Sequence, residues 1–471
     1  MMGCQYTALR IFVPVLIMLL SLELSGQVDY VIIDSVIVTG IKKTKREVIM
    51  REIDLQPGDT IGLGQMAQKI TANEKRILST GLFTLVSINI KNWNTDNSTC
   101  NLAVEVRENW YIYPYPIFEL ADRNFNVWSR EQNYSLKRVN YGVAFNHINF
   151  TGLKDKLKLK FQQGFTHKYE ITYEYPYLLR GWGLSANYLY SQNRETAYIA
   201  RGNKPVFLRL GDERTLLRSH RAGISLLHRS NVWLYHKFSA EYNNVSVDSV
   251  LVNEYNDRFL GEGRTSLRFL ALDYLLRYDR TLYPLYPMGG YRMEANARKE
   301  GLGWLSNTDN AWIALAGEYH IPFLSRFIFS TRLKAKKNLL NNPLPYYLNG
   351  GIGYRDDNMM GYQLYVLDGR DFILSNNSIK LRILDRNFRM AEWFPQAYKL
   401  MNARLFLRFS FDYGYANDPV FGIINQYSNT HQYGFGPAFD AILFNTMTFS
   451  CEYGVTRFGE KGFFLRSDVN F

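Results

Sequence analysis

The chain has 471 residues, a formal net charge of +12 and 15% aromatic residues. After the amino terminus, no stretch approaches the roughly 20 consecutive apolar residues that a transmembrane helix requires. Lys and Arg are spread along the chain rather than clustered, which argues against nucleic-acid binding. Abundant aromatic residues without long apolar runs suit a transmembrane β-barrel that carries aromatic girdles at both membrane surfaces.

Residues 1–26 have the pattern of a secretory signal peptide. Arg10 gives a basic start, residues 11–20 form a short apolar segment, and small residues follow at a suitable cleavage position. The apolar segment is too short to span a bilayer, so an uncleaved anchor is the weaker interpretation. The mature chain then keeps two cysteines, Cys100 and Cys451. Because they fall in different predicted domains, we expect no disulfide bridge between them.

Residues 27–109 predict a small α/β domain with the order strand, helix, helix, strand, strand. The expected boundaries are a strand ending at Gly40, a helix starting at Thr44, a turn at 56–59, a helix stopping at Gly81, and strands at 85–93 and 101–108. Thr44 and Glu47 form a capping-box pattern. The residues expected to face the domain core are Val48, Ile49 and Ile53 in the first helix, and Met66, Ile70, Ile77 and Leu78 in the second.

Residues 110–471 are dominated by alternating apolar and polar side chains, which is the period of a β-strand. In one clear case Arg404, Arg408, Ser410 and Asp412 alternate with Leu405, Leu407, Phe409, Phe411 and Tyr413. A soluble sandwich shows the same pattern strand by strand. In a membrane barrel, however, the lumen supplies water to the charged face and lipid contacts the apolar face. We therefore predict an antiparallel transmembrane β-barrel over these residues.

The last strand, 463–471, is expected to close this barrel. Its one face carries Phe463, Leu465, Ser467, Val469 and Phe471. No sheet edge can stay unpaired in hydrocarbon, so this strand must meet the first strand, near 111–120. Pro114 and Pro116 in that first strand each lack a backbone donor. The sequence therefore predicts a weak seam between the first and last strands.

The first domain resembles a POTRA domain through Val36-x-Val38-x-Gly40, the helix start at Thr44 and Gly81-Leu82-Phe83. With the barrel, nearly the whole mature chain resembles the BamA/TamA superfamily of outer-membrane assembly factors, in a short form with one POTRA domain. The resemblance implies 16 strands and a place in the outer membrane of a Gram-negative bacterium, with the POTRA-like domain in the periplasm. The implied partners are outer-membrane lipid, unfolded barrel clients and periplasmic or lipoprotein accessory subunits.

The resemblance also implies a long loop that folds into the lumen and carries a Val-Arg-Gly-Tyr or Val-Arg-Gly-Phe tip. The candidate lies within 338–372, where Met360, Gly361 and Tyr362 occupy the motif and Met360 replaces its arginine. The alternative interpretation of Gly361 and Tyr362 is an ordinary turn.

In the family, the motif arginine pairs with acidic residues of the barrel wall. The matching acid here is Asp412, with Asp440 as a second candidate. Arg355 and Arg370 are the expected sources of the missing positive charge. Asp357, in the same loop, is expected to be exposed.

Neither a catalytic site nor a cofactor site is expected. The seven histidines show no metal-ligand spacing, and no nucleophile elbow or phosphate-binding loop is present. The function implied by the resemblance is assembly and insertion of outer-membrane proteins, through client binding by the POTRA sheet edge and opening of the seam. A protein secretion pore, and a passive channel or structural barrel with the POTRA-like domain as a spacer, are the alternatives.

Overall fold

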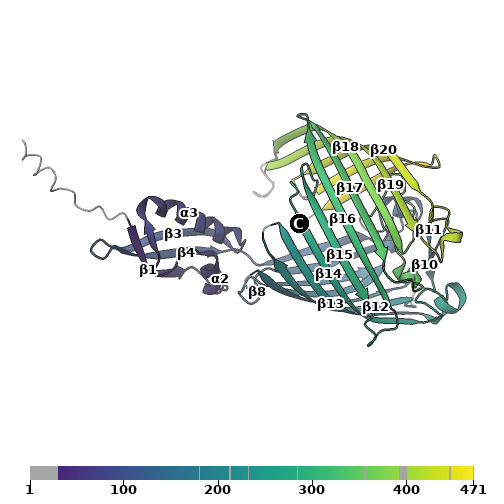
Figure 1. Cartoon of the computed structure of the whole chain (residues 1–471), viewed down its shortest axis with the longest axis horizontal. Coiled ribbons are helices and arrows are strands. Elements are labelled where there is room, and N and C mark those ends of the chain that lie inside the picture. Colours follow the sequence, from purple (N-terminus) through teal and green to yellow (C-terminus); the bar gives the residue numbers. More distant parts are fainter. Residues whose placement is uncertain are drawn as a thin grey trace, which may run out of the picture. The chain divides into compact units, whose positions relative to one another are not determined.

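A computed structural model describes residues 30–179, 181–211, 214–231, 233–283, 285–354, 357–391, 400–444 and 447–469 (Figure 1). The chain forms two compact units. The first comprises residues up to Ile112 together with His147–Asp155, and the second comprises Tyr113–Asn146 and Lys156–Phe471. The expected signal peptide lies outside the described residues. Among the residues that are described, no helix is long and apolar enough to cross a membrane.

The first unit is a four-stranded sheet with two helices, and its element order agrees with the prediction apart from one additional short strand. The elements are β1 (Tyr30–Thr39), α2 (Arg46–Glu52), β2 (Thr60–Gly62), α3 (Leu63–Ser79), β3 (Phe83–Asn94) and β4 (Thr99–Glu108). The strand order is β2-β1-β4-β3, with β1 and β4 parallel. Alternate apolar residues of the strands pack against Val48, Ile49, Ile53, Met66 and Ile77 of the helical segments and close one core.

Two local expectations for this unit are wrong. Leu78 is 46% exposed rather than part of the core. Thr44 does not cap α2, because the N-cap residue is Lys45 and makes no side-chain capping bond. The Thr44 hydroxyl instead lies 2.8 Å from the Tyr111 hydroxyl and accepts a hydrogen bond from Nδ2 of Asn149 at 2.9 Å. These buried polar partners compete successfully with the helix end for the threonine side chain.

The segment 147–155, which lies between two barrel strands in the sequence, belongs to the first unit. The Lys45 amide donates to the Gly152 carbonyl at 2.9 Å. Gly152 has a φ of +91°, and a Cβ there would lie 2.3 Å from the Lys43 carbonyl oxygen. The close approach therefore requires glycine. No local pattern in the sequence had indicated this association.

The second unit contains the predicted antiparallel barrel sheet, with 16 strands. They are β5 (Ile112–Leu120), β6 (Val139–His147), β7 (Lys156–Gly164), β8 (Thr166–Leu179), β9 (Trp182–Asn193), β12 (Leu217–Arg229), β13 (Leu234–Val247), β14 (Ser266–Asp279), β15 (Gly290–Glu300), β16 (Asn310–Phe323), β17 (Phe327–Asn338), β18 (Asp371–Arg389), β19 (Leu400–Asn417), β20 (Gln432–Leu443), β21 (Met447–Thr456) and β22 (Lys461–Val469). Each strand pairs with its neighbours in this order, and β5 and β22 are the two ends of the sheet.

Shorter elements lie in the connections of the barrel. They are the hairpin β10 (Glu195–Arg201) and β11 (Lys204–Arg209), the helix α4 (Phe125–Arg130), a π-helix at Leu251–Tyr255, and 3-10 turns at Leu136–Arg138, Tyr346–Leu348 and Gly422–Ile424. Hydrophobic residues of several of these connections form a separate buried cluster, which includes Leu251, Phe259, Tyr346 and Phe421. The connections are therefore packed against one another.

The predicted alternation of faces is confirmed on the barrel wall. On β19, Leu407, Phe409 and Phe411 are exposed, whereas Arg404, Ser410 and Asp412 are buried on the lumen side. Cys451 is exposed on β21, and Cys100 is buried in the first unit. The outer face is thus apolar and the inner face polar, as a membrane barrel requires.

The Glu108 carboxylate stabilises the first unit through hydrogen bonds. It accepts from the amides of Lys43 and Thr44 at 2.6–3.1 Å. Burial alone raises its pKa, but the hydrogen bonds from Thr44 and Lys43 outweigh burial and hold the pKa of Glu108 below its ordinary value. A carboxyl group of this kind stabilises the fold above its unfolded pKa of about 4.3, and the stabilisation is lost as the pH falls through the lower folded value.

We expect Glu108→Gln to destabilise the first unit by about 1–2 kcal/mol at pH 7, because an ionised acceptor is replaced by a neutral one. The difference between the variant and the natural chain should shrink as the pH falls below about 4. Urea-dependent pulse proteolysis of the first unit measures both effects. Glu105→Gln is the matched control, since Glu105 lies on the same strand in an exposed pair with Lys91. Equal destabilisation by the two changes would contradict this role of Glu108.

Candidate functional site in the barrel lumen

The connection between β17 and β18 folds back as the predicted lumen loop. Its tip is formed by Met359, Met360, Gly361 and Tyr362, and the side chains of the two methionines and the tyrosine are buried. Gly361 has a φ of +83°, a conformation that favours glycine. The Tyr362 hydroxyl donates to Oε1 of Gln432 on β20 at 2.9 Å. The tip is therefore held against the wall and is not an exposed turn.

Three glycines of consecutive wall strands make room for this tip. A Cβ on Gly414 of β19 would lie 2.4 Å from Sδ of Met359, and one on Gly434 of β20 would lie 1.9 Å from the Met360 carbonyl oxygen. On β21, a Cβ on Gly454 would lie 2.5 Å from the Gly361 nitrogen. At Gly434 and Gly454 any larger residue would push the loop backbone away, whereas at Gly414 it would displace the Met359 side chain. We call Gly414, Gly434 and Gly454 the glycine pad.

Asp412 does meet the loop tip, but through a backbone group. The Met360 amide donates to Oδ2 of Asp412 at 2.8 Å, and the Asn377 amide donates to Oδ1 at 3.3 Å. Arg370 does not supply the missing charge to this acid, because its guanidinium donates to the Leu340 carbonyl. Arg355 lies outside the described residues. In the described part of the chain, the loop group that bonds Asp412 is therefore neutral, contrary to the expectation.

The positive charge next to the second candidate acid comes from the wall itself. Arg408 of β19 donates to Asp440 at 2.7 and 3.1 Å and to Glu452 of β21 at 2.7 Å. Glu452 also accepts a hydrogen bond from Nε2 of Gln363 in the loop at 2.8 Å. Arg408 thus supplies the positive charge of this cluster from the wall, and the loop contributes an amide to the same cluster.

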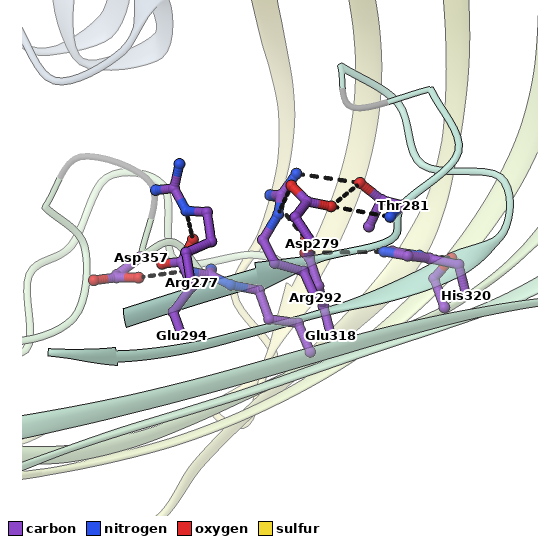
Figure 2. A network of polar contacts seen from close by, with 10 residues as sticks. Arg277, Asp279, Thr281, Arg292, Glu294, Glu318, His320 and Asp357 are labelled. Carbon is purple, nitrogen blue, oxygen red and sulfur yellow. Dashed lines mark hydrogen bonds and ion pairs between the residues drawn. The ribbon is translucent and has the colours of Figure 1, made fainter. Parts of the chain in front are cut away.

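The loop carries an acid that is anchored on another wall strand, β17. Asp357 pairs with Arg332 at 3.0 Å and with Lys334 at 2.5 Å, both on β17. Its side chain is 13% exposed, so the expectation of an exposed acid is wrong. Figure 2 shows Asp357 beside the charged network of the neighbouring strands. The loop provides the negative partner here and the wall provides the positive ones, which is the reverse of the arrangement that the resemblance implied.

The wall beside this anchor is lined by further ion pairs (Figure 2). Arg292 of β15 lies 2.8 Å from Asp279 of β14 and 2.9 Å from Glu318 of β16. Arg277 of β14 lies 2.7 Å from Glu294 of β15. These cross-strand pairs compensate charges that face the lumen. Among the described residues, no group of His, Cys, Asp and Glu is arranged to hold a metal ion.

A second inward segment reaches the lumen from the turn between β14 and β15. The Tyr286 hydroxyl donates to Oδ2 of Asp440 at 2.6 Å, and Nζ of Lys380 donates to the Pro287 carbonyl at 3.2 Å. A cavity of about 280 Å³ lies between this turn and the loop tip, since both Tyr286 and Met360 line it. The two inward segments narrow the lumen from opposite ends.

Asp368 holds the end of the loop that leads into β18. The Tyr354 hydroxyl donates to its Oδ1, and the Ser428 hydroxyl donates to its backbone carbonyl at 3.1 Å. Burial raises the pKa of Asp368 to about 7, despite the hydrogen bond from Tyr354. Near neutral pH, this part of the loop therefore contains an acid that is close to its titration midpoint.

The seam is the remaining predicted feature. Among the described residues, no ladder joins β5 to β22. Pro114 and Pro116 are exposed residues of β5, as predicted for a strand with few donors. Val469 is the last residue of β22, and Phe471 lies outside the described residues. Over its described residues, 461–469, the closing strand agrees with the prediction, but no pairing of these residues with the first strand is seen.

Comparisons with known proteins place these features in context. The family model described as POTRA, surface antigen variable number repeat, matches residues 31–109. The structure of BamA from Haemophilus ducreyi lacking POTRA domains 1–3 matches with a TM-score of 0.65 at 13% identity, over 93% of this chain and 85% of that one. CdiB from Escherichia coli matches with a TM-score of 0.49 at 10% identity, over 95% and 92% of the two chains. No curated protein sequence is similar enough to count as a match.

The first unit is therefore a POTRA domain, and the second has the barrel fold seen in BamA. The chain thus combines a domain that matches the POTRA model with a barrel of the fold seen in BamA. The apolar outer face and polar inner face of this barrel suit the outer membrane, the location that the sequence predicted.

The glycine pad gives a sharp test of loop seating. Gly434→Ala and Gly454→Ala are each expected to displace the loop tip, because the new Cβ would overlap backbone atoms that cannot rotate away. Tryptic cleavage of the folded protein after Arg355 or Arg370 should become at least about tenfold faster. Gly317→Ala on β16 is the control, since a Cβ there meets nothing within 4 Å. An unchanged cleavage rate in both pad variants would mean that the pad does not hold the loop.

Asp357→Asn should loosen the same loop at its contact with β17. The change removes the carboxylate that pairs with Arg332 and Lys334, and we expect a loss of about 1–3 kcal/mol in loop seating. The same tryptic assay reports it. Glu262→Gln provides the comparison, because the Glu262 side chain is 81% exposed in another connection. If both variants behave like the natural chain, the charge pair does not anchor the loop.

Proposed function

We propose that this protein inserts barrel proteins into the outer membrane by pairing their strands at the seam between β5 and β22. The observation that carries the proposal is the pair of sheet ends without a joining ladder among the described residues. A strand edge in hydrocarbon needs a hydrogen-bonding partner, and an incoming strand is such a partner. The prolines of β5 weaken any closure by this strand, because each removes a donor.

The narrowed lumen favours insertion over the two alternatives. A secretion pore and a passive channel both need a continuous aqueous path. Here the loop tip and the turn at Tyr286 both occupy the lumen and leave cavities of about 280 and 670 Å³ beside the loop. Secretion would require both segments to leave. Insertion at the seam leaves them in place.

In this proposal the POTRA domain binds the client before insertion. Its end strand β3 offers a backbone edge for an extended segment, and binding of this kind depends on main-chain hydrogen bonds. One donor of β3 is already used, because the Ile88 amide donates to Oε1 of Glu74 on α3 at 2.7 Å. Client pairing is therefore expected on the parts of β3 on either side of Ile88.

A reversible crosslink tests the seam. Cysteines at Ile117 of β5 and Val469 of β22, in a Cys451→Ser background, should form a disulfide when the two strands approach each other. We expect the oxidised protein, reconstituted in lipid vesicles, to lose at least about 90% of its ability to insert an unfolded barrel client, because the edges can no longer receive a strand. Reductant should restore insertion.

Single-cysteine variants under the same oxidation are the controls. Heat-modified mobility on gels verifies that the crosslinked barrel stays folded. Full insertion activity with the crosslink formed would rule out the seam as the site of insertion. Unimpaired insertion together with loss of one secreted product on depletion would instead support a secretion pore.

A further inference from the structure

The edge of the closing strand is occupied by a helix from the first connection of the barrel. Helix α4 follows β5 in the sequence, and its side chains bond the backbone of β22. The contact joins residues 339 positions apart. It uses the strand edge that faces away from β21, because Leu465 is opposite Cys451 in the ladder on the other side.

Asn126 acts on this edge like one peptide group of a neighbouring strand. The Leu465 amide donates to Oδ1 of Asn126 at 3.0 Å, and Nδ2 of Asn126 donates to the Leu465 carbonyl at 3.3 Å. A carboxamide carries the same donor and acceptor as a backbone amide, so both polar groups of Leu465 are satisfied. Asn126 is itself only 3% exposed.

Two further residues extend the contact. Nη2 of Arg130 donates to the Phe463 carbonyl at 2.8 Å, two residues along the same edge. This spacing is the period at which a strand presents its groups to one neighbour. Phe125 lines an apolar cavity of about 350 Å³ together with Phe439, Phe449 and Leu465. Helix α4 therefore covers both the backbone edge and part of the apolar face next to it.

The lumen loop holds α4 in this position. The N-cap residue Asn124 accepts from the Val127 amide at 2.9 Å and donates from Nδ2 to the Gln363 carbonyl of the loop at 2.6 Å. Arg123 donates to the carbonyls of Gly353, Leu364 and Tyr365 at 2.9–3.0 Å. A continuous set of hydrogen bonds therefore runs from the seated loop, through the start of α4, to the closing strand.

We propose that α4 is a resident cap on the edge of β22, and that an extended strand of a client binds the same backbone groups of Phe463 and Leu465 by displacing it. The inference rests on the proposed function, and it adds the site of pairing and its intramolecular competitor. A strand supplies backbone amides in a continuous row, whereas α4 supplies one carboxamide and one guanidinium. A longer stretch of paired edge gives the strand the advantage once it has begun to pair.

Hydrogen exchange of the full-length protein in lipid vesicles tests the cap directly. In Asn126→Ala, the Leu465 amide loses its acceptor, and its exchange is expected to be at least about tenfold faster than in the natural chain. Ser129→Ala is the matched control on the same helix, because the Ser129 hydroxyl bonds only the Asn126 carbonyl within α4. Unchanged exchange of Leu465 in Asn126→Ala would overturn the cap.

Competition tests the second half of the proposal. The probe is a synthetic peptide with the sequence of residues 447–456, the strand that pairs with β22 on its other side. We expect the peptide to protect the 463–465 segment at about tenfold lower concentration in Asn126→Ala than in the natural chain. Arg130→Ala removes a more exposed contact and should shift the concentration in the same direction, even if Asn126→Ala does not fold. Equal concentrations in the natural chain and a folded variant would overturn the competition.

These two measurements are independent of client insertion. Faster insertion of an unfolded barrel by Asn126→Ala would support both the cap and the proposed function. Faster exchange and tighter peptide binding without any insertion activity in the natural chain would reject the proposed function and leave the cap in place.

Discussion

Backbone amides in hydrocarbon have no water to bond, so every strand edge within a membrane must find a partner inside the protein. The barrel satisfies this constraint along its wall by pairing 16 consecutive strands. In the described sheet, β5 and β22 each have a neighbouring strand on one edge only. There, polar side chains of α4 bond the groups of Leu465 and Phe463 that a strand would otherwise bond. The seam is thus the place where the fold depends on side chains instead of a backbone ladder.

The lumen obeys a related constraint on charge. A charged group in a confined space needs a partner of opposite sign, but the chemistry does not dictate which element carries which sign. In this chain Arg408 belongs to the wall and pairs with Asp440 and Glu452, also of the wall. The loop then contributes an acid, Asp357, to the cations of β17. The wall therefore supplies a cation to the cluster of Asp440 and Glu452, while the loop tip carries Met360 in place of the motif arginine.

The loop tip also fits closely against the barrel wall. Without a long cation at the tip, the loop backbone approaches the wall closely enough to require glycine on two strands, and the Met359 side chain lies against the glycine of a third. The Met360 amide reaches Asp412, and its carbonyl lies over Gly434. Close packing and a backbone hydrogen bond therefore replace a long-range ion pair. Because the seated loop also bonds Asn124 and Arg123, its position is physically connected to the closing strand.

The sequence by itself determined the POTRA-like order of elements, the antiparallel barrel with its two faces, and the extent of the lumen loop. These features follow from periodicity and turn chemistry, which neighbouring residues encode. The number of strands and the identity of the tip came from the family resemblance. The two prolines of the first strand were also evident in the sequence alone.

Only the tertiary structure decided which polar groups meet. Thr44 carries a capping pattern but bonds Tyr111 and Asn149. Asp357 has the sequence context of an ordinary loop acid, yet it pairs with Arg332 and Lys334 of β17. Asn126 has no local signal for its contact with Leu465. Such pairings depend on strand register and on how the connections fold over the barrel. Residues hundreds of positions apart are brought together only when the sheet has formed, so local sequence pattern cannot specify them.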